Sequence, residues 1–460
     1  MYQIDFNCPV WVHFIGIGGI SMSGLAEVLL ERGFRVTGSD MSVSPLTKKL
    51  ESEGAGIYVG QKAENVQDGM DVVVYTAAIH PDNPEFAEVV RRGIPMLTRA
   101  ELLGQLMKNY PVAVGISGTH GKTTTTSMVT EILLAAEADP TISVGGMLDS
   151  IGGNIRVGKS DFFVTEACEY TNSFLSMYPT VGVILNVSAD HLDFFKDLED
   201  IRHSFRRFAE LIPAAGLLII SSNIPNVQEL TEGLACRVQM VGDRAEDDFS
   251  MSEITYDALG RPEFTVKEAG RELGRVLVGV PGEHNAWNAL AAIAVGRELE
   301  VPFKTICESL KKFGGAHRRF EKKGVLGEDV LIIDDYAHHP DEIRATLRAA
   351  ARCDRKRIVV AFQPHTYTRT KALMDEFADA LSLADEVILA KIYPARETDN
   401  LGISSQTLAD KIAEKGKKVT YLSTFDEIEN YVLSHCMNGD MFITMGAGDI
   451  VKVGENLLSL

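Results

Sequence analysis

Short apolar runs and helical patterns alternate through much of this chain. Near the N-terminus the runs WVHFIGIGG, FRVTGSD and DVVVYTAA are separated by helical segments, the first of which is expected over residues 22–32. The same alternation returns from residue 329 onward. This rhythm predicts α/β domains, in which mostly parallel strands carry helices on both faces.

The length of 460 residues exceeds what one hydrophobic core usually organises, so about three domains are expected. A helical pattern ends before the new strand VAVGISG, and paired glycines followed by the charged run HRRFEKKG are typical of a linker. We predict an α/β fold in three parts, with Rossmann-like first and third domains and a central domain of the P-loop ATPase type. The expected ranges are 1–107, 108–316 and 317–460.

Composition narrows the choice of partners and location. The formal net charge of −19 argues against nucleic acid or an anionic membrane surface, because such partners select a basic protein surface. Six scattered cysteines include no C-x-x-C pair, so neither a zinc site nor a disulfide framework is expected. The N-terminus lacks a signal-peptide pattern, and no apolar run reaches about 18 residues. We therefore expect a cytoplasmic protein without membrane insertion, as a monomer or a homodimer.

The first glycine cluster, GIGGISMSG, lies between a predicted strand and a predicted helix. Gly16, Gly18 and Gly19 permit a tight turn and a close approach to a diphosphate, whose charge a helix N-terminus stabilises. Asp40 ends the next predicted strand, where an acidic side chain would meet a ribose hydroxyl. Ser21 occupies the third glycine position of a dinucleotide fingerprint, so NAD remains one of several candidates. A tight turn without a ligand would need the same glycines.

The second glycine cluster, GISGTHGKTTTT, also joins a strand to a helix. The most common phosphate loop would need glycine at the position of Ile116, so the spacing is different. Successive N–H groups of such a turn bind a phosphate, while Lys122 supplies a charge for the β- and γ-phosphates and Thr123 a hydroxyl for Mg²⁺. The threonine run would equally cap the helix. The combination predicts a nucleoside triphosphate site.

Polar side chains at the ends of further predicted strands complete the pattern. Glu166 and His191 end or follow two strands of the central segment and are candidate metal ligands, although each would also serve as a structural group. DDYAHHPDE and FQPHTYTRT follow two strands of the third segment. A rim of imidazole and guanidinium groups suits a carboxylate or phosphate substrate.

Taken together, these motifs resemble the Mur ligases. GISGTHGKTTTT is similar to their ATP loop, and LNVSADHLD, GEHNAWNALAA and HRRFE follow in the family's order, so that the resemblance covers the whole chain. FIGIGGISMSGLAE, DDYAHHPDEI, FQPHTYTRTKAL and GAGDI are similar to the branch that joins L-alanine to UDP-N-acetylmuramate. The resemblance implies ATP-dependent ligation through an acyl phosphate in peptidoglycan synthesis, with Mg²⁺ or Mn²⁺ as cofactor.

The resemblance also assigns roles to positions. The implied UDP-sugar-binding residues are Gly16, Gly18, Gly19, Met22, Ser23, Ser39 and Asp40. The implied ATP-binding residues are Gly118, Thr119, His120, Gly121, Lys122, Thr123, Thr124, His284, Asn285, Asn288, Arg319 and Asp335. The implied metal ligands are Thr123, Glu166 and His191, and the implied amino-acid-binding residues are Tyr336, His338, His365 and Arg369. The implied catalytic residues are Lys122, Glu166, His191, Arg319 and His338.

The chain departs from the family pattern in three places. Many Mur ligases carry a carbamylated lysine about fifteen residues after the metal-binding histidine, where this chain reads RHSFRRF; the alanine-adding branch commonly lacks that lysine. Thr366 stands where some members have a second arginine. TEACEYTNSF differs from the more acidic EADES version, which favours Glu166 over Glu169 as the metal ligand.

Three other interpretations remain open from the sequence. A tripeptide-recycling Mur ligase would use the same sugar nucleotide with a peptide as the amine. A nicotinamide-dependent oxidoreductase would explain the first glycine turn but not the Lys122 loop. A non-catalytic regulator would bind ATP without releasing phosphate.

Overall fold

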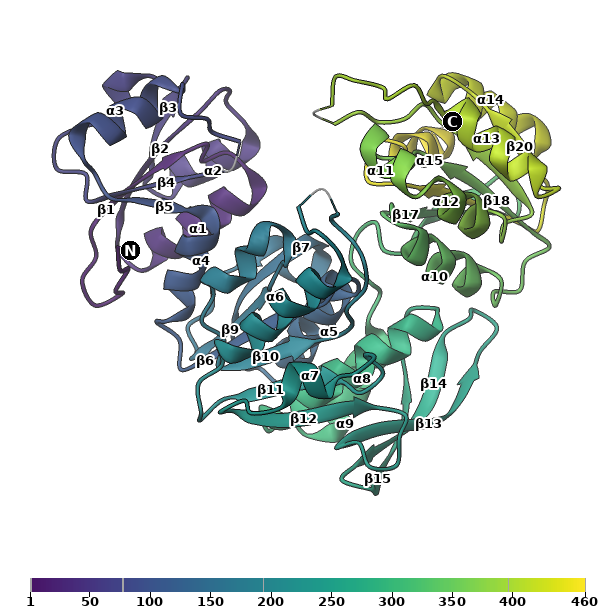
Figure 1. Cartoon of the computed structure of the whole chain (residues 1–460), viewed down its shortest axis with the longest axis horizontal. Coiled ribbons are helices and arrows are strands. Elements are labelled where there is room, and N and C mark those ends of the chain that lie inside the picture. Colours follow the sequence, from purple (N-terminus) through teal and green to yellow (C-terminus); the bar gives the residue numbers. More distant parts are fainter. Residues whose placement is uncertain (1, 77, 193, 396, 460) are drawn as a thin grey trace. The chain divides into compact units, whose positions relative to one another are not determined.

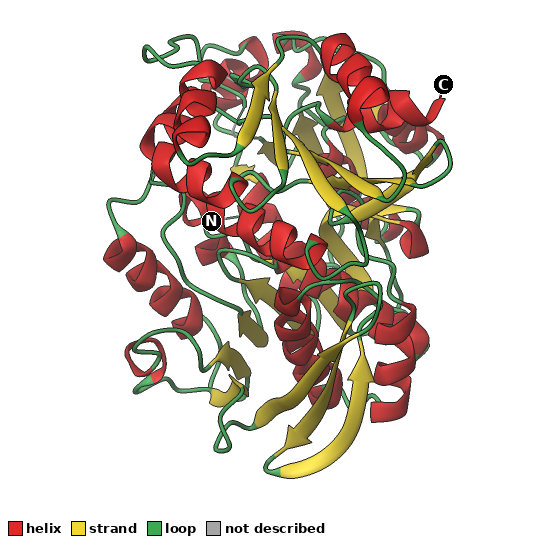
Figure 2. Ribbon diagram, turned by 90° about the vertical axis from the view of Figure 1, so that its right-hand side faces the viewer, coloured by secondary structure: helices red, strands yellow, loops and turns green. Residues whose placement is uncertain are grey.

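The computed structural model describes residues 2–76, 78–192, 194–395 and 397–459. Its strands form three sheets, and Figure 2 shows the strands lying among helices throughout. Contacts divide the chain into two compact units. One contains the chain up to Met251 with Lys267–Leu273 and Leu290–Ser309; the other contains Ser252–Val266, Gly274–Ala289 and everything from Leu310. The predicted α/β architecture with three sheets is confirmed.

The first sheet has the order β3-β2-β1-β4-β5, and its strands are parallel (Figure 1). Because the strand order reverses at β1, the loop after β1 lies at the switch point where ligands of such sheets bind. The elements of this part are β1 (Trp11–Ile15), α1 (Ile20–Glu31), β2 (Arg35–Asp40), α2 (Pro45–Ser52), β3 (Gly56–Val59), η1 (Ala63–Asn65), β4 (Val72–Tyr75), α3 (Pro84–Arg92), β5 (Met96–Thr98) and α4 (Arg99–Met107).

The second sheet is built around β6, which lies between β10 and β9 and is parallel to both. Seven neighbouring strands of this sheet belong to the first unit, in the spatial order β12-β11-β10-β6-β9-β7-β8. The elements of the middle segment are β6 (Val112–Ser117), α5 (Lys122–Ala135), β7 (Thr141–Leu148), η2 (Asp149–Ile151), β8 (Gly153–Arg156), β9 (Phe162–Glu166), η3 (Tyr170–Ser176), β10 (Val181–Ile184), α6 (Leu198–Glu210), β11 (Leu217–Ser221), α7 (Gln228–Thr231), β12 (Arg237–Gly242), β13 (Phe249–Tyr256), β14 (Pro262–Glu268), β15 (Arg271–Leu277), α8 (Glu283–Glu298) and α9 (Phe303–Lys312).

The third sheet has the order β16-β17-β21-β18-β19-β20 and lies in the second unit. Along β18, Val360 and Phe362 pack into one core, whereas Val359 and Ala361 pack into another, as expected for a strand buried on both faces. The elements are β16 (Glu321–Leu326), β17 (Val330–Asp335), α10 (Pro340–Ala350), β18 (Arg357–Phe362), α11 (Tyr367–Ala372), α12 (Met374–Leu381), β19 (Glu386–Leu389), α13 (Ser405–Glu414), β20 (Lys418–Tyr421), α14 (Phe425–His435), β21 (Asp440–Met445) and α15 (Val451–Ser459).

One sequence interpretation is wrong in part. The charged run HRRFEKKG was expected to be a linker, but its second half begins β16, which pairs antiparallel with β17. Charged side chains are common on edge strands, where they discourage pairing with other chains, so their presence does not distinguish an edge strand from a linker.

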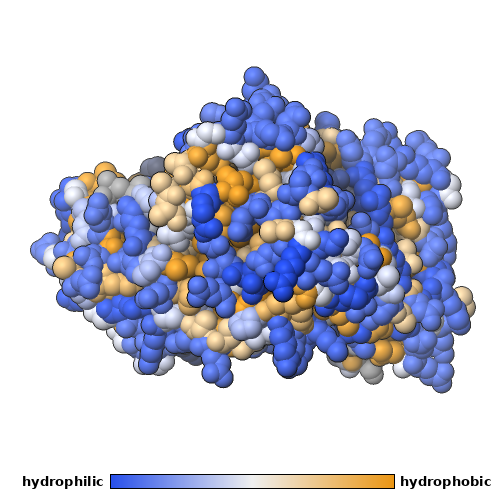
Figure 3. All heavy atoms as spheres, turned by 90° about the horizontal axis from the view of Figure 1, so that it is seen from below, coloured by the Kyte–Doolittle hydropathy of each residue, from blue (hydrophilic) through white to orange (hydrophobic). Residues whose placement is uncertain are grey.

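The outer surface agrees with the composition. Figure 3 shows one face of the molecule, on which hydrophilic residues predominate and hydrophobic ones form scattered patches. Among the described residues, no helix is both long and apolar enough to cross a membrane.

Gly104 allows α4 to pack closely on η3. A methyl group at this position would overlap the backbone carbonyl of Ser176. Because the obstacle is backbone, it cannot move aside as the end of a flexible side chain can. Gly104 therefore permits the close contact between α4, which follows the first sheet, and η3 of the middle segment, both in the first unit.

We predict that Gly104→Ala lowers the free energy of unfolding by about 1–3 kcal/mol, the usual cost of overpacking. Gly153→Ala is the control, since a methyl group there meets only ordinary contacts. Thermal or denaturant unfolding checks the prediction, and equal stability of the two variants would contradict it.

Candidate functional site

The loop between β6 and α5 has a backbone that only glycine adopts without strain. Gly118 has a φ of +144° and Gly121 a φ of +87°. A Cβ on Gly118 would also lie 2.9 Å from the Cβ of Leu185. The glycines in this motif are therefore required by the turn itself and by its close approach to the neighbouring segment.

That neighbouring segment, residues 185–188, fixes the loop through hydrogen bonds. The amide of Thr119 donates to the carbonyl of Asn186 at 3.2 Å, and the amide of His120 donates to the Asn186 side chain at 2.8 Å. The amide of Ser188 donates to the Thr119 hydroxyl at 2.9 Å. The loop is thus held on one side by the segment that follows β10 and continues to His191.

The helix after the loop is not capped by threonine, contrary to one reading of the sequence. Gly121 is the N-cap of α5, and it has no side chain to satisfy the first amides. Thr125 and Thr126 are fully buried, and Thr123 is 7% exposed. The uncapped N-terminus leaves backbone N–H groups for an anion, which is the arrangement that binds phosphates.

Lys122, the first residue of α5, is held by three acceptors. Its Nζ donates to the carbonyl of Gly118 at 2.6 Å, to that of Thr119 at 3.1 Å and to the carboxylate of Glu169 at 2.9 Å. Burial is the largest single effect and disfavours the charged ammonium, but Glu169, Cys168 and Glu166 together outweigh it, so the pKa of Lys122 is raised. The side chain therefore carries a positive charge at the base of the loop.

Glu166 and His191 lie beside this lysine. Glu166 ends β9, and its Oε1 accepts a hydrogen bond from the amide of Gly145 at 2.5 Å. His191 has a left-handed φ of 53°, its Nε2 lies 3.9 Å from the carboxylate of Glu169, and its ring lies 4.5 Å from that of Tyr170. These carboxylate and imidazole donors, with the Thr123 hydroxyl, fit a divalent cation such as Mg²⁺ or Mn²⁺.

The first glycine turn is tied to the end of β2. The amide of Gly18 donates to Asp40 Oδ2 at 2.8 Å, and the amides of Gly16 and Ile17 both donate to the Ser39 carbonyl at 2.9 Å. Gly19 is the N-cap of α1 and offers no side-chain hydrogen bond. Asp40 thus shapes the turn directly, in addition to any contact with a ligand.

Under this turn lies a buried polar network. Ser39 is fully buried, and its hydroxyl donates to Glu85 at 2.6 Å. The other oxygen of Glu85 lies 2.6 Å from Nε2 of His13, whose Nδ1 contacts Thr37 at 2.8 Å. The Ser39 side chain is therefore engaged inside the domain, and only its carbonyl reaches the turn. Met22 and Ser23, also buried, pack in α1 behind it.

In the second unit, the end of β17 carries two acidic side chains with different partners. Asp334 accepts from Arg318 Nε at 3.0 Å, whereas Asp335 accepts from the amides of Ala337 at 2.7 Å and Phe320 at 2.9 Å. Burial raises the pKa of Asp335 to about 6, against the opposing effect of the Arg319 charge. The guanidinium of Arg319 lies 5.3 Å from the centre of the Tyr336 ring.

Aromatic and imidazole rings gather after β17 and β18. The ring centres of Tyr336 and His338 are 5.4 Å apart, those of His338 and His365 are 6.1 Å apart, and that of His365 stacks on Tyr393 at 5.6 Å. Nη1 of Arg369 lies 3.5 Å from Nδ1 of His365. Burial, and then the Arg369 charge, lower the pKa of His365, so this ring is neutral at neutral pH.

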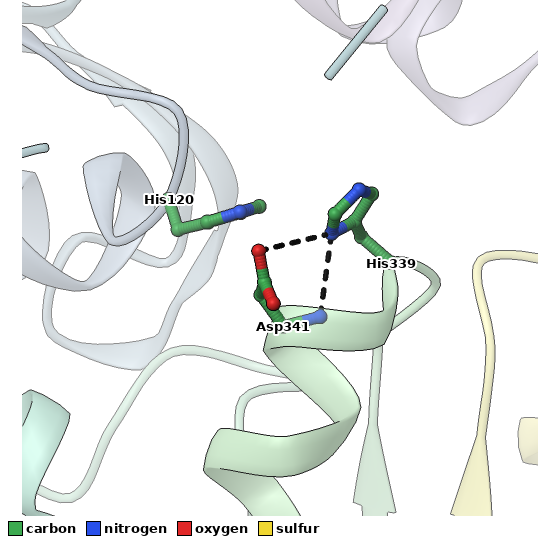
Figure 4. Close-up of side chains that lie close together, drawn as sticks. All are labelled: His120, His339 and Asp341. Carbon is green, nitrogen blue, oxygen red and sulfur yellow. Dashed lines mark hydrogen bonds and ion pairs between the residues drawn. The ribbon is translucent and has the colours of Figure 1, made fainter. Parts of the chain in front are cut away.

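The helix α10 begins beside this cluster with a capping box at His339. Its Nδ1 accepts from the amide of Asp341 at 3.3 Å and lies 3.8 Å from the carboxylate of Asp341 (Figure 4). Nδ1 of His338 lies 3.2 Å from the carbonyl of Tyr336 and 3.3 Å from Glu342. These contacts fix the imidazoles of the HHPDE motif at the end of β17.

The stretch His284–Asn288 is locally ordered at the start of α8. Asn285 donates to the carbonyl of Pro281 at 2.7 Å and accepts from Asn288 at 3.1 Å. Burial lowers the pKa of His284 to about 4. The ring is therefore neutral at pH 7 and has one donor and one acceptor nitrogen.

Within the first unit, the carboxylate of Glu169 lies between Lys122 and His191, and the charge of Glu166 acts on Lys122. Within the second unit, the structure brings together Tyr336, His338, His365 and Arg369. Sequence reasoning ranked Glu169 below Glu166 and did not single out Glu85 or Tyr393. The contact of Glu169 with Lys122, 47 positions away, is long-range and has no local signal in the sequence. No sequence signal marked Glu85 or Tyr393.

Comparison with known proteins defines the class. Residues 11–111 match the family model described as "Mur ligase family, catalytic domain", residues 116–296 the "Mur ligase middle domain", and residues 318–448 the "Mur ligase, glutamate ligase domain". These matches cover most of the sequence. The chain belongs to the Mur ligase family.

Individual relatives refine this placement. A UDP-N-acetylmuramate–L-alanine ligase of Lachnospira eligens is 59% identical over 459 residues, and one of Agathobacter rectalis is 55% identical over 458, each match covering 100% of both chains. Among solved structures, a UDP-N-acetylmuramate–alanine ligase of Thermotoga maritima is 30% identical with a TM-score of 0.79. A murein peptide ligase of Psychrobacter arcticus is 26% identical with a TM-score of 0.70, and each match covers 98% of both chains.

We predict that the His284 ring titrates with a midpoint near pH 4, because burial destabilises its charged form. A lowered folded-state pKa means that the unfolded chain binds the extra proton between the two midpoints, so this residue's contribution to stability is present above about pH 6.5 and is lost as the pH falls toward 4.

Histidine NMR, with His284→Gln to assign the signal, measures the midpoint directly. The difference in unfolding free energy between wild type and this variant should change over the same pH range. A ring signal that titrates near pH 6.5, the ordinary value for histidine, would contradict the prediction.

Proposed function

We propose that this chain joins L-alanine to the carboxylate of UDP-N-acetylmuramate with cleavage of ATP to ADP and phosphate, an early step of peptidoglycan synthesis. The observation that carries the proposal is the group of Lys122, Glu166 and His191 around an uncapped, glycine-formed helix N-terminus. Relatives at 55–59% identity over the full length, named for this reaction, support the choice of substrates. Because the chain belongs to the Mur ligase family, we no longer interpret the first glycine turn as the dinucleotide site of an oxidoreductase.

The substrates are distributed over the chain. UDP-N-acetylmuramate is proposed to bind at the Gly16–Gly19 turn and α1, with Asp40 and the Ser39 carbonyl fixing the turn. The proposed domain ranges, 1–107, 108–316 and 317–460, are supported by the end of α4 at Met107 and the start of β16 at Glu321. A cytoplasmic location and a monomeric or dimeric state remain predictions.

ATP is proposed to bind the loop from Gly118 to Thr124. Amides at the N-terminus of α5 bind its phosphates, and Lys122 neutralises charge that develops as the γ-phosphoryl group is transferred. His284, Asn285 and Asn288 are proposed to contact adenine, Asp335 the ribose and Arg319 the phosphates. Thr123, Glu166 and His191 would hold Mg²⁺ or Mn²⁺, which supplies positive charge for the phosphates.

The chemistry follows from the poor reactivity of a carboxylate. Its negative charge repels nucleophiles, so one carboxylate oxygen first bonds to the γ-phosphorus of ATP as the bond to ADP breaks. The α-amine of L-alanine then attacks the carbonyl carbon, and phosphate leaves with that oxygen. Preorganised donors at the developing charge typically contribute several kcal/mol each.

The amino acid is proposed to bind in the ring cluster after β17 and β18. Arg369 pairs with the amino-acid carboxylate, and the neutral His365 beside it does not compete for the anion. His338, whose Nδ1 lies near the Tyr336 carbonyl, would carry its lone pair on Nε2 and assist removal of the amine proton.

The experiment that tests this function combines the protein with ATP, Mg²⁺, UDP-N-acetylmuramate and an amine donor, and measures phosphate release and the new amide. L-Alanine should support turnover, and omission of either acceptor or donor should stop it. Glycine, L-serine and a peptide beginning with L-alanine are the comparison donors. Preference for the peptide would indicate the recycling ligase instead, and ATP binding without turnover would indicate a regulator.

We predict that Lys122→Ala lowers kcat by at least about 100-fold, as expected for loss of a group that stabilises transition-state charge. Lys304→Ala, which removes a lysine whose side chain is 88% exposed in the same unit, is the matched control. Circular dichroism confirms folding of both. Activity of Lys122→Ala within about tenfold of wild type would remove the loop from the mechanism.

We predict that Arg369→Ala raises KM for L-alanine by at least about tenfold and KM for ATP by much less, because a charge-assisted bond to the amino-acid carboxylate is lost. Arg355→Ala is the control. Arg355 precedes β18 and pairs with Asp329, which precedes β17, so this pair lies at the amino ends of the strands, whereas Arg369 follows the carboxyl end of β18. Equal effects of Arg369→Ala on both Michaelis constants would contradict its assignment.

A further inference from the structure

Glu169 is a buried carboxylate whose role in the site is unassigned. Its side chain is only 2% exposed. Burying a carboxylate is expensive unless an opposite charge accompanies it. Both of the cationic or potentially cationic groups next to it, Lys122 and His191, belong to the proposed nucleotide and metal site.

The ion pair with Lys122 uses both carboxylate oxygens. Nζ lies 2.9 Å from Oε2 and 3.2 Å from Oε1, and the carbonyls of Gly118 and Thr119 take the remaining donor directions. An ammonium group has three N–H donors, and these three acceptor groups engage them all. Lys122 can therefore contact a phosphate only by weakening at least one of these bonds.

The negative charge of Glu169 disfavours binding of a nucleotide that carries no divalent cation. A triphosphate bound at the N-terminus of α5 places several negative charges near the buried carboxylate, and one ammonium group cannot neutralise both. A divalent cation near Glu166 and His191 adds two positive charges to the same region. Glu169 is 3.9 Å from the Nε2 atom of His191, so it lies beside that cation's proposed ligand.

We propose that Glu169 is a positioning residue that holds Lys122 in the loop and makes nucleotide binding depend on the divalent cation, which replaces Lys122 as the counter-charge of this carboxylate. The inference rests on the proposed function, since it takes ATP as the ligand of the loop. It concerns a residue outside the proposed metal ligands and ATP contacts. It also gives the site a third acidic or imidazole side chain, beside Glu166 and His191, where the chain lacks the lysine of other family members.

The test is equilibrium binding of ATP, by calorimetry, to the full chain in excess EDTA and in excess Mg²⁺. Wild type should bind ATP much more weakly in EDTA. Glu169→Gln removes the charge and keeps the shape and an acceptor oxygen for Lys122. This variant should bind metal-free ATP at least about tenfold more tightly than wild type, and its gain in affinity on adding Mg²⁺ should fall by a similar factor.

Two further variants make the result specific. Glu199→Gln makes the same charge change at an exposed position of α6 in the same unit and should match wild type in both conditions. Glu169→Asp retains the charge and should keep the wild-type dependence on Mg²⁺, even if Glu169→Gln is poorly folded. A merely structural role would alter affinity equally with and without metal.

The outcomes separate the inference from the proposed function. Equal metal-free affinity of wild type and Glu169→Gln, or loss of the Mg²⁺ dependence in Glu169→Asp, would overturn the inference and leave the ligase assignment intact. Failure of wild type to bind ATP even with Mg²⁺ would overturn both.

Discussion

The site depends on a backbone constraint at the loop between β6 and α5. Gly118 and Gly121 adopt left-handed conformations, and a side chain on Gly118 would collide with the segment that begins at Leu185. This turn leaves α5 without a side-chain cap and places Lys122 at its first position. The uncapped helix N-terminus, where we propose that phosphate binds, therefore results from joining β6 to α5 within four residues beside the segment that begins at Leu185.

Candidate site residues also lie in the loops at the ends of other strands. The first sheet reverses its order beside the Gly16 turn, and the middle sheet places Glu166 and the segment before His191 on either side of β6. Chemically active groups thus occur where parallel strands end, and the central strands, such as β1, β10 and β18, are mostly apolar and buried. The sheets provide rigid support, and the loops provide the chemistry. This separation is consistent with the proposed binding of a nucleotide, a sugar nucleotide and an amino acid at different segments.

Much of this was predictable from the sequence because it is local. Alternating apolar runs predicted the sheets, and the second glycine cluster predicted the turn between β6 and α5, whose binding of phosphate stays a prediction. What failed depends on contacts between distant residues or on backbone conformation. Capping by the threonine run was one alternative, but Gly121 is the cap. Ser39 was expected beside the sugar nucleotide, but its hydroxyl donates to Glu85, 46 positions away. Glu169 reaches Lys122 across 47 positions because the chain reverses after β9, and no periodic pattern encodes that reversal.

The central claim is that the Lys122 loop activates a carboxylate by phosphoryl transfer before the amide forms. The most direct measurement uses UDP-N-acetylmuramate with heavy oxygen in both positions of its carboxylate and follows the isotope by mass spectrometry during turnover with ATP and L-alanine. An acyl phosphate intermediate predicts that each released phosphate carries one labelled oxygen and each amide product retains one. Phosphate free of label, formed at the same rate as the amide, would contradict the account.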